Sequence, residues 1–212
     1  MVLMEEGEYH LGFLEVRDFV GSFKGAGKDK TIITVMNHMN GQAVLDKNLL
    51  PDLLKFVGGN VQMSHFTLQT PEGKLTDTGL PAGNIKCLVA LTAGNATYEF
   101  NNEERSIKAV IDQVRFKGHE LEGGPGYTKG HNCNMGLRAG YDCLSGSAGS
   151  VSRAKIDVKV TNSDFETFVY ALTLEGTKNG RLIVGEKNSG NTFSDNDQCG
   201  GFWESRDRKS VV

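Results

Sequence analysis

The chain has 212 residues, a formal net charge of −3 and a sequence pI of about 6.0. Hydrophobic residues make up 38% and charged residues 23%, which is enough to build a core and excludes an intrinsically disordered chain. The slightly acidic balance makes nucleic acid an unlikely partner, because proteins that bind phosphates carry a basic excess or stripe.

Glycine is the compositional outlier, with 27 residues against only 4 prolines. Glycine that rises without proline and without a three-residue period excludes collagen and indicates tight turns, bulges and loops. No apolar run reaches the roughly 20 residues that span a bilayer, and the start, MVLMEEGEYH, lacks the features of a signal peptide. We therefore expect a soluble protein without a membrane partner, located in the cytoplasm or in an assembled particle.

Most of the chain has the pattern of β-strands. Clusters of Gly, Pro, Asn and Asp, which are typical of turns, separate the candidates. In the first half these candidates are residues 8–24, 31–36, 61–69, 84–92, 96–100 and 106–117. In the second half, residues 154–160 alternate apolar and polar side chains, which predicts a strand with one buried face. Residues 165–176 are predicted to pair with them as a hairpin or adjacent strand, and residues 181–187 to form a third strand.

One segment predicts a helix. From Asn48 to Gly59, five apolar residues recur at helical spacing: Leu49, Leu50, Leu53, Leu54 and Val57. Asn48 is a suitable N-cap, and the two glycines at 58 and 59 are a suitable stop. Residues 107–114 also fit helical spacing, but their β-branched content favours a strand.

The number of strands argues against a parallel α/β fold, in which each strand needs a crossover helix. The sequence instead predicts a mainly β fold, an antiparallel sandwich or barrel-like sheet with one or two short helices. No internal repeat is evident, so residues 1–212 are predicted to form a single β-rich domain. A long glycine-rich loop at 118–150 is the only candidate for an internal boundary.

The glycine-rich stretch also contains the main candidate site. His119, His131, Cys133 and Cys143 are the right ligand types for Zn²⁺, although their spacing lacks the CxxC turn of most structural zinc sites. Cys133 and Cys143 are also a candidate disulfide in an oxidising environment. A third alternative is a nucleophile, with His131 lowering the pKa of the Cys133 thiol. The default is an ordered loop with free thiols and no cofactor.

Three further motifs fall short of a site. Residues 23–31 resemble a phosphate-binding loop, but Ser22 and Asp29 replace its first glycine and its hydroxyl residue, so a turn is expected. Ser147 lacks the first glycine of a nucleophile elbow. Asp195 and Asp197 fit the first positions of an EF-hand, but its later ligands are missing, which leaves only a looser Ca²⁺ site as an alternative to a polar loop.

The aromatic pair Phe202 and Trp203 lies near the C-terminus. These side chains are expected to anchor the tail on the fold, with binding of a partner as the alternative.

Because the catalytic motifs fail, the sequence favours a non-enzymatic structural protein or binding module. The leading hypothesis is a self-assembling subunit of a shell, tube or fibre, a homo-oligomer that uses long polar loops for its contacts. The alternative is a metal-binding protein or an enzyme that uses the His/Cys-bearing loop 118–143. A carbohydrate-binding module is a third possibility, which the single tryptophan weakens, and the identity of any small-molecule ligand stays open.

Overall fold

The computed structural model describes residues 1–35, 52–70, 85–92, 106–121, 130–131, 133–140, 152–175, 177–184 and 190–203. Every regular element in these residues is a β-strand. The described residues therefore contain no helix with the length and apolarity that crossing a membrane would require. The strands are β1 (Val2–Leu3), β2 (Gly7–Leu11), β3 (Leu14–Lys24), β4 (Thr31–Val35), β5 (Asp52–Gln69), β6 (Ile85–Thr92), β7 (Ile107–Lys117), β8 (Glu120–Leu121), β9 (Gly130–His131), β10 (Cys133–Gly140), β11 (Ser152–Thr161), β12 (Asp164–Glu166), β13 (Tyr170–Glu175), β14 (Thr177–Ile183), β15 (Thr192–Ser194) and β16 (Gln198–Trp203).

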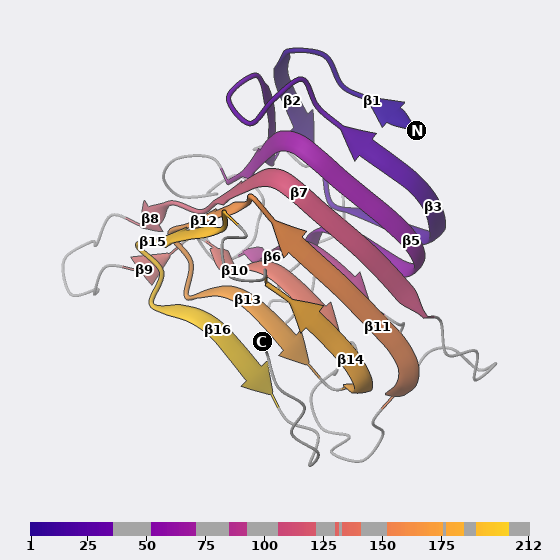
Figure 1. Cartoon of the computed structure of the whole chain (residues 1–212). Helices are drawn as coiled ribbons and strands as arrows, with labels where there is room; N and C mark the ends of the chain where they lie inside the picture. Colours follow the sequence, from indigo (N-terminus) through magenta and orange to yellow (C-terminus); the bar gives the residue numbers. More distant parts are fainter. Residues whose placement is uncertain are drawn as a thin grey trace, which may run out of the picture.

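The strands stack as the coils of a parallel β-solenoid. Each strand of the large sheet pairs in parallel with strands one coil before or after it, and the short β8–β9 pair is antiparallel. The long strands β5 and β7 bend around corners and so belong to more than one side of the solenoid. Figure 1 shows β3, β5, β7, β11 and β14 side by side in one layer, with β1 and β2 at one end of the molecule.

The register of the pairs defines three faces. Face A contains residues 14–17, residues 52–57, β6, β10, β13 and β16. Face B contains β1, residues 19–24, residues 59–64, residues 107–112, β11 and β14. Face C contains β2, β4, residues 66–69, residues 114–117, β12 and β15. Among the described residues, each face therefore has six stacked strand segments.

The corners between faces are formed by residues with positive φ. Left-handed backbone turns the strand onto the next face within one or two residues, and glycine, Asn and Asp tolerate it best. At Gly59 only glycine fits, because φ is 98° and a Cβ would overlap the carbonyl oxygen of Phe19. The other corner residues and their φ angles are Asp18 (51°), Gly58 (72°), His65 (62°), Gln113 (55°), Asn162 (49°), Thr167 (64°) and Asp195 (54°).

Two asparagines connect neighbouring coils in the same way. The Asn191 side chain accepts a hydrogen bond from the Ser163 amide and donates one to the Val160 carbonyl. The Asn196 side chain accepts from the Phe168 amide and donates to the Phe165 carbonyl. These bonds satisfy backbone groups that the bends remove from the strand ladders.

The core lies between the three faces. On face C it is a column of stacked rings, in which Phe116 and Phe165 lie 4.7 Å apart and Phe165 and Phe193 lie 5.4 Å apart. Above them in the same column are Ile33 and Leu68, which are also buried. Identical positions of successive coils therefore stack apolar side chains on one another, which is how parallel coils bury a continuous core.

The mainly β prediction is confirmed, but the predicted antiparallel sandwich is wrong, because the large sheet is parallel and nearly closed on itself. The large sheet is parallel because the chain winds through three faces before it returns to the same one, and short strands and bends serve as its crossovers. The prediction overlooked this solution, since it considered only helices as connections between parallel strands.

The predicted helix is also wrong in its described part. Residues 52–57 belong to β5, and Leu53, Leu54 and Val57 are buried in the sheet. Gly58 and Gly59, taken as a helix stop, instead turn the chain from face A to face B. Residues 48–51 lie outside the described residues.

Most predicted strands are confirmed, but the predicted hairpin is not. The strand predicted over residues 8–24 is divided into β2 and β3. The other confirmed ranges each lie within one strand: 31–35, 61–69, 85–92, 107–117, 154–160 and 181–183. Residues 96–100 are outside the described residues. After β11 the chain bends at Asn162 into β12, and β11 pairs with β7 and β14 rather than with β13. Within the glycine-rich stretch 118–150, residues 133–140 form β10.

Candidate functional site

The most distinctive surface is the end of the solenoid that carries its first coil. We call β1, β2 and residues 14–22 of β3 the N-terminal edge. Among the described residues, β1 pairs only with β3, β2 pairs only with β4, and residues 14–22 pair only with β5. One side of each of these segments therefore presents backbone N–H and C=O groups that no described strand covers.

Apolar side chains gather on this edge. Val20 is 77% exposed and Leu3 is 64% exposed, and the other exposed apolar residues here are Met1, Val2, Tyr9 and Leu14. Directly inside lies a ring cluster in which Phe19 is 4.9 Å from Phe23, and both rings are 5.8 Å from the buried Phe56. The edge thus extends the core to the surface, and large exposed apolar patches mark interaction sites.

The loop between β3 and β4 holds its own coil against the next one. The Gly25 and Gly27 amides donate to the carbonyls of Ser64 and His65, both at 2.9 Å. The Thr67 hydroxyl donates to the Lys28 carbonyl at 2.6 Å. At Gly25 a Cβ would overlap the His65 carbonyl oxygen, so this close approach requires glycine. The expectation of a turn over 23–31, rather than a phosphate loop, is confirmed.

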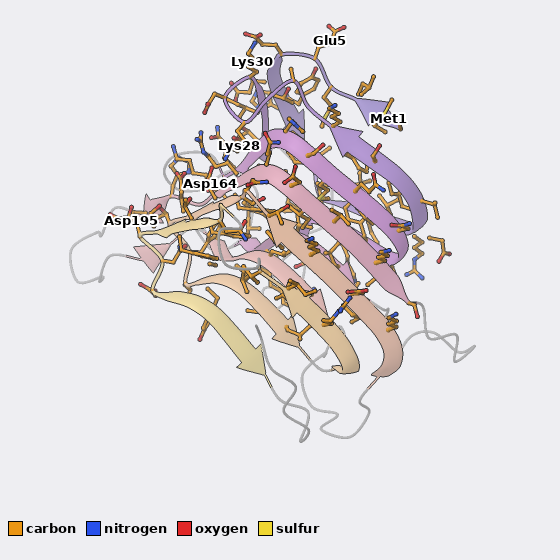
Figure 2. The ribbon with its side chains drawn as sticks, in the orientation of Figure 1. Met1, Glu5, Lys28, Lys30, Asp164 and Asp195 are labelled. Carbon is orange, nitrogen blue, oxygen red and sulfur yellow. The ribbon has the colours of Figure 1, made fainter. Side chains whose placement is uncertain are left out.

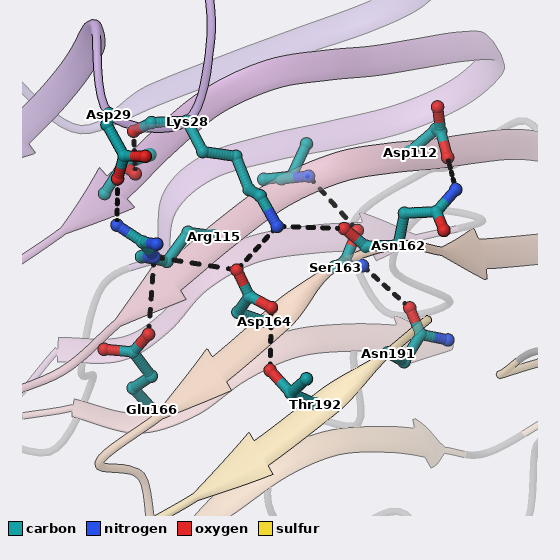
Figure 3. A network of polar contacts seen from close by, with 12 residues as sticks. Lys28, Asp29, Asp112, Arg115, Asn162, Ser163, Asp164, Glu166, Asn191 and Thr192 are labelled. Atoms are coloured by element: carbon teal, nitrogen blue, oxygen red, sulfur yellow. Dashed lines mark hydrogen bonds and ion pairs between the residues drawn. The ribbon is translucent and has the colours of Figure 1, made fainter. Parts of the chain in front are cut away.

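The same loop carries two charged side chains across face C. Lys28 Nζ donates to Asp164 Oδ2 at 2.7 Å, and Asp29 Oδ1 accepts from Arg115 at 2.7 Å. Arg115 Nε lies 3.6 Å from Asp164 Oδ2 and 3.3 Å from Glu166 Oε1. We call these five residues the polar clamp. Figure 2 shows Lys28 beside Asp164 on the outer surface, and Figure 3 shows the clamp at close range.

The polar clamp favours the charged forms of Asp164 and Arg115. Burial alone would raise the pKa of Asp164, but hydrogen bonds from Lys28 and Thr192 and the charges of Lys28 and Arg115 lower it. Burial alone would lower the pKa of Arg115. The hydrogen bond to Asp29 and the negative charges of Asp29, Glu166 and Asp164 raise that pKa instead. Among the described residues, Arg115 Nε lies against two carboxylates without a hydrogen bond. The clamp is therefore a set of ion pairs rather than a fully hydrogen-bonded network, and neither Asp164 nor Arg115 is tuned to titrate near neutral pH.

Register explains why these residues meet. Thr67, Arg115, Asp164 and Thr192 occupy one position in four successive coils of face C. The clamp connects the β3–β4 loop to residues 136 positions later in the chain. It therefore ties this loop to the coils below.

A second polar group is buried on face A. Arg138 donates to Asp52 Oδ2 at 2.7 Å, and the two side chains are 1% and 8% exposed. Burial and, secondarily, Asp52 raise the pKa of the Cys87 thiol, and burial raises that of Cys133. Both cysteines are free and donate hydrogen bonds to backbone carbonyls. Protonated, buried thiols are inert, so the structure does not favour the nucleophile predicted at Cys133.

The zinc hypothesis falls partly on undescribed residues. Cys133 is buried in β10, His131 lies in β9, and His119 Nδ1 lies 3.2 Å from the Thr70 hydroxyl. Cys143 is outside the described residues, so both the zinc site and the Cys133–Cys143 disulfide stay predictions. In the described part of the chain, no three His, Cys, Asp or Glu residues are grouped to hold a metal ion.

The remaining candidate residues lie near the C-terminal end of the solenoid. Asp195 forms a corner with φ of 54°, and the Asp197 amide donates to the Phe168 carbonyl. The Ca²⁺ hypothesis for these two residues is untested. Phe202 and Trp203 are in β16, in register with Leu174 and Glu175, and Ser147 lies outside the described residues.

Comparison with protein-family models, curated proteins and solved structures finds no match to the chain. The geometry of the N-terminal edge is therefore the main indication of function. Sequence reasoning missed this edge, because exposed apolar residues within strands resemble core residues until their partners are known.

Proposed function

We propose that the chain is a non-enzymatic structural or binding protein, a self-assembling solenoid subunit of a tube or fibre whose contact surface is the N-terminal edge. One observation carries the proposal. The edge combines strand backbone that no described strand covers with six exposed apolar side chains, among them Val20 at 77%.

Both properties favour association. An exposed strand edge is a template for pairing with another strand, and proteins that stay monomeric protect such edges with charges, prolines or covering loops. Here the edge residues include Glu8, Glu15 and Arg17, but apolar side chains stand among them. Burying apolar surface stabilises a complex by roughly 25 cal/mol per Å² before the entropic cost of association is subtracted.

The test compares the sedimentation of three proteins over a range of concentrations. The wild type is expected to associate as its concentration rises. Leu3→Lys/Val20→Lys, which places two charges on the edge, is expected to sediment as a monomer with an unchanged circular dichroism spectrum. The control Gln62→Lys adds a charge to an exposed residue in the middle of face B and is expected to associate like the wild type.

A wild-type chain that stays monomeric at every concentration would overturn the proposal. Equal association of the wild type and the edge variant would show that another surface makes the contact.

A further inference from the structure

We infer that copies of this chain stack head to tail, with β15 of one copy pairing in parallel with β2 of the next, so that Phe193 packs on Tyr9. This inference rests on the proposed function and specifies the surface that occupies the N-terminal edge. The second contact surface is the opposite end of the solenoid, where β15 pairs only with β12 among the described residues.

A single column of face C connects the two ends. Successive register pairs join its six members, one from each strand segment of that face: Tyr9, Ile33, Leu68, Phe116, Phe165 and Phe193. The four inner members are buried, whereas Tyr9 and Phe193 at the ends are 39% and 36% exposed. Each end therefore presents a partly exposed aromatic ring, Phe193 stacked on Phe165 at one end and Tyr9 in register with Ile33 at the other.

The ring geometry already has the spacing that a stack requires. Phe116 and Phe165 are nearly parallel, at 6° and 4.7 Å, and Phe165 and Phe193 follow at 8° and 5.4 Å. A strand added at the usual spacing of about 4.8 Å places the next ring at about the same distance from Phe193. Tyr9 of a second copy occupies that position when β2 continues the ladder.

The polar residues beside this column also suit the arrangement. Tyr9 is flanked in β2 by Glu8 and His10, and Phe193 is flanked in β15 by Thr192 and Ser194. In the parallel register, Glu8 faces the Thr192 hydroxyl and His10 faces the Ser194 hydroxyl. No like charges meet, and the Ser194 hydroxyl is able to hydrogen bond with His10, whereas the Thr192 hydroxyl already donates to Asp164 Oδ1.

The other two faces permit the same stacking. On face B, Val2 lies above Phe23 in the column that continues through Met63, Ile111 and Val160. On face A, the column that begins at Leu14 ends at Gly200 in β16. A head-to-tail copy continues the parallel pairing of all three faces, whereas a two-fold copy makes the edge strands antiparallel. A head-to-tail contact does not close on itself and produces a fibre.

Cross-linking between two variants, each with one engineered cysteine, tests the inference. Tyr9→Cys and Phe193→Cys are each made in a Cys143→Ser/Cys199→Ser background, which retains only the buried native thiols Cys87 and Cys133. One variant carries a mass tag, and the mixture is oxidised at a concentration at which the untagged wild type associates. Register neighbours on adjacent strands have the Cα separation that a disulfide needs.

The expected product is a mixed disulfide between the two variants, with little homodimer of either. The matched control replaces Tyr9→Cys by Glu8→Cys, whose side chain points to the opposite side of β2, and is expected to cross-link at least about tenfold less.

The failures of the two proposals are distinguishable. Predominant Tyr9→Cys homodimers, in an associating protein, would overturn the head-to-tail arrangement in favour of two-fold pairing and leave the proposed function intact. No specific cross-link in an associating protein would also overturn the arrangement. Only a monomeric wild type would remove the proposed function as well.

Discussion

Lys28 and Lys30 lie two residues apart in one loop and provide a matched pair of perturbations. Lys28 Nζ is 2.7 Å from Asp164, and the two side chains are 27% and 12% exposed. Lys30 Nζ is 3.7 Å from Glu6, and those side chains are 59% and 70% exposed. Methionine retains most of the aliphatic length of lysine and removes the charge, so each Lys→Met variant tests one ion pair.

Lys28→Met is expected to lower the free energy of unfolding by about 2 kcal/mol. Hydrogen bonds to charged groups contribute about 1.5–3 kcal/mol. Without Lys28 the partly buried Asp164 carboxylate loses its closest positive charge and keeps the Thr192 hydroxyl and the more distant Arg115 as partners. For a chain of this size, that change lowers Tm by about 4–8 °C. Lys30→Met is expected to cost less than about 0.5 kcal/mol, as is usual for exposed pairs.

Urea unfolding measures both variants, and a double-mutant cycle with Asp164→Asn isolates the pair. The coupling between Lys28 and Asp164 is expected to account for at least half of the Lys28→Met effect. Equal effects of the two lysine variants, or a coupling near zero, would refute the view that the polar clamp fixes the β3–β4 loop on the coils below.

Three further predictions follow from individual contacts. The pKa of Asp164 is depressed in the folded protein, so its contribution to folding stability is present above about pH 4 and is lost as the pH falls through the folded pKa. Urea unfolding at a series of acidic pH values should therefore show a steeper loss of stability for the wild type than for Asp164→Asn. Asn191→Ala and Asn196→Ala each remove two hydrogen bonds to the backbone of the preceding coil. Each variant is expected to lower the free energy of unfolding in urea by about 2 kcal/mol. A loss below about 0.5 kcal/mol would show that water replaces these bonds. Gly59→Ala is expected to lower the free energy of unfolding by more than about 2 kcal/mol or to prevent folding, because its Cβ would overlap the Phe19 carbonyl. Circular dichroism and Tm measure the effect. A Tm within about 2 °C of the wild type would contradict the described corner.

The strands were predictable because their alternation and β-branched content are local properties. Residues 154–160 show this most clearly, since Ile156, Val158 and Val160 are buried as their alternation indicates. Local alternation does not specify the partner strand, however. It fits a parallel coil as well as an antiparallel hairpin, so the pairing of β11 with β7 and β14 was not readable from it.

The repeat was hidden by the unequal lengths of the coils. Equivalent positions of successive coils are separated by 35 residues at Thr34 and Gln69, by 49 at Val114 and Ser163, and by 28 at Asp164 and Thr192. A repeat search looks for a fixed period, which this chain lacks. The corner signals were also weak, because Gln113 and Thr167 adopt positive φ despite having side chains that rarely favour it.

The two surfaces of the candidate site were beyond sequence reasoning for the same reason. Tyr9 and Phe193 belong to different strand candidates, and only the register shows that they end one column. Lys28 and Asp164 are 136 residues apart, and their contact depends on three intervening coils.

Diffraction from oriented, concentrated protein measures how the strands of neighbouring copies are arranged. Head-to-tail stacking predicts fibres with a strong axial reflection at about 4.8 Å, from the spacing of stacked strands. It also predicts an axial repeat of about 29 Å, because each chain contributes six strand segments per face at that spacing. Closed particles of fixed size, or fibres whose strands run along the axis, would contradict it.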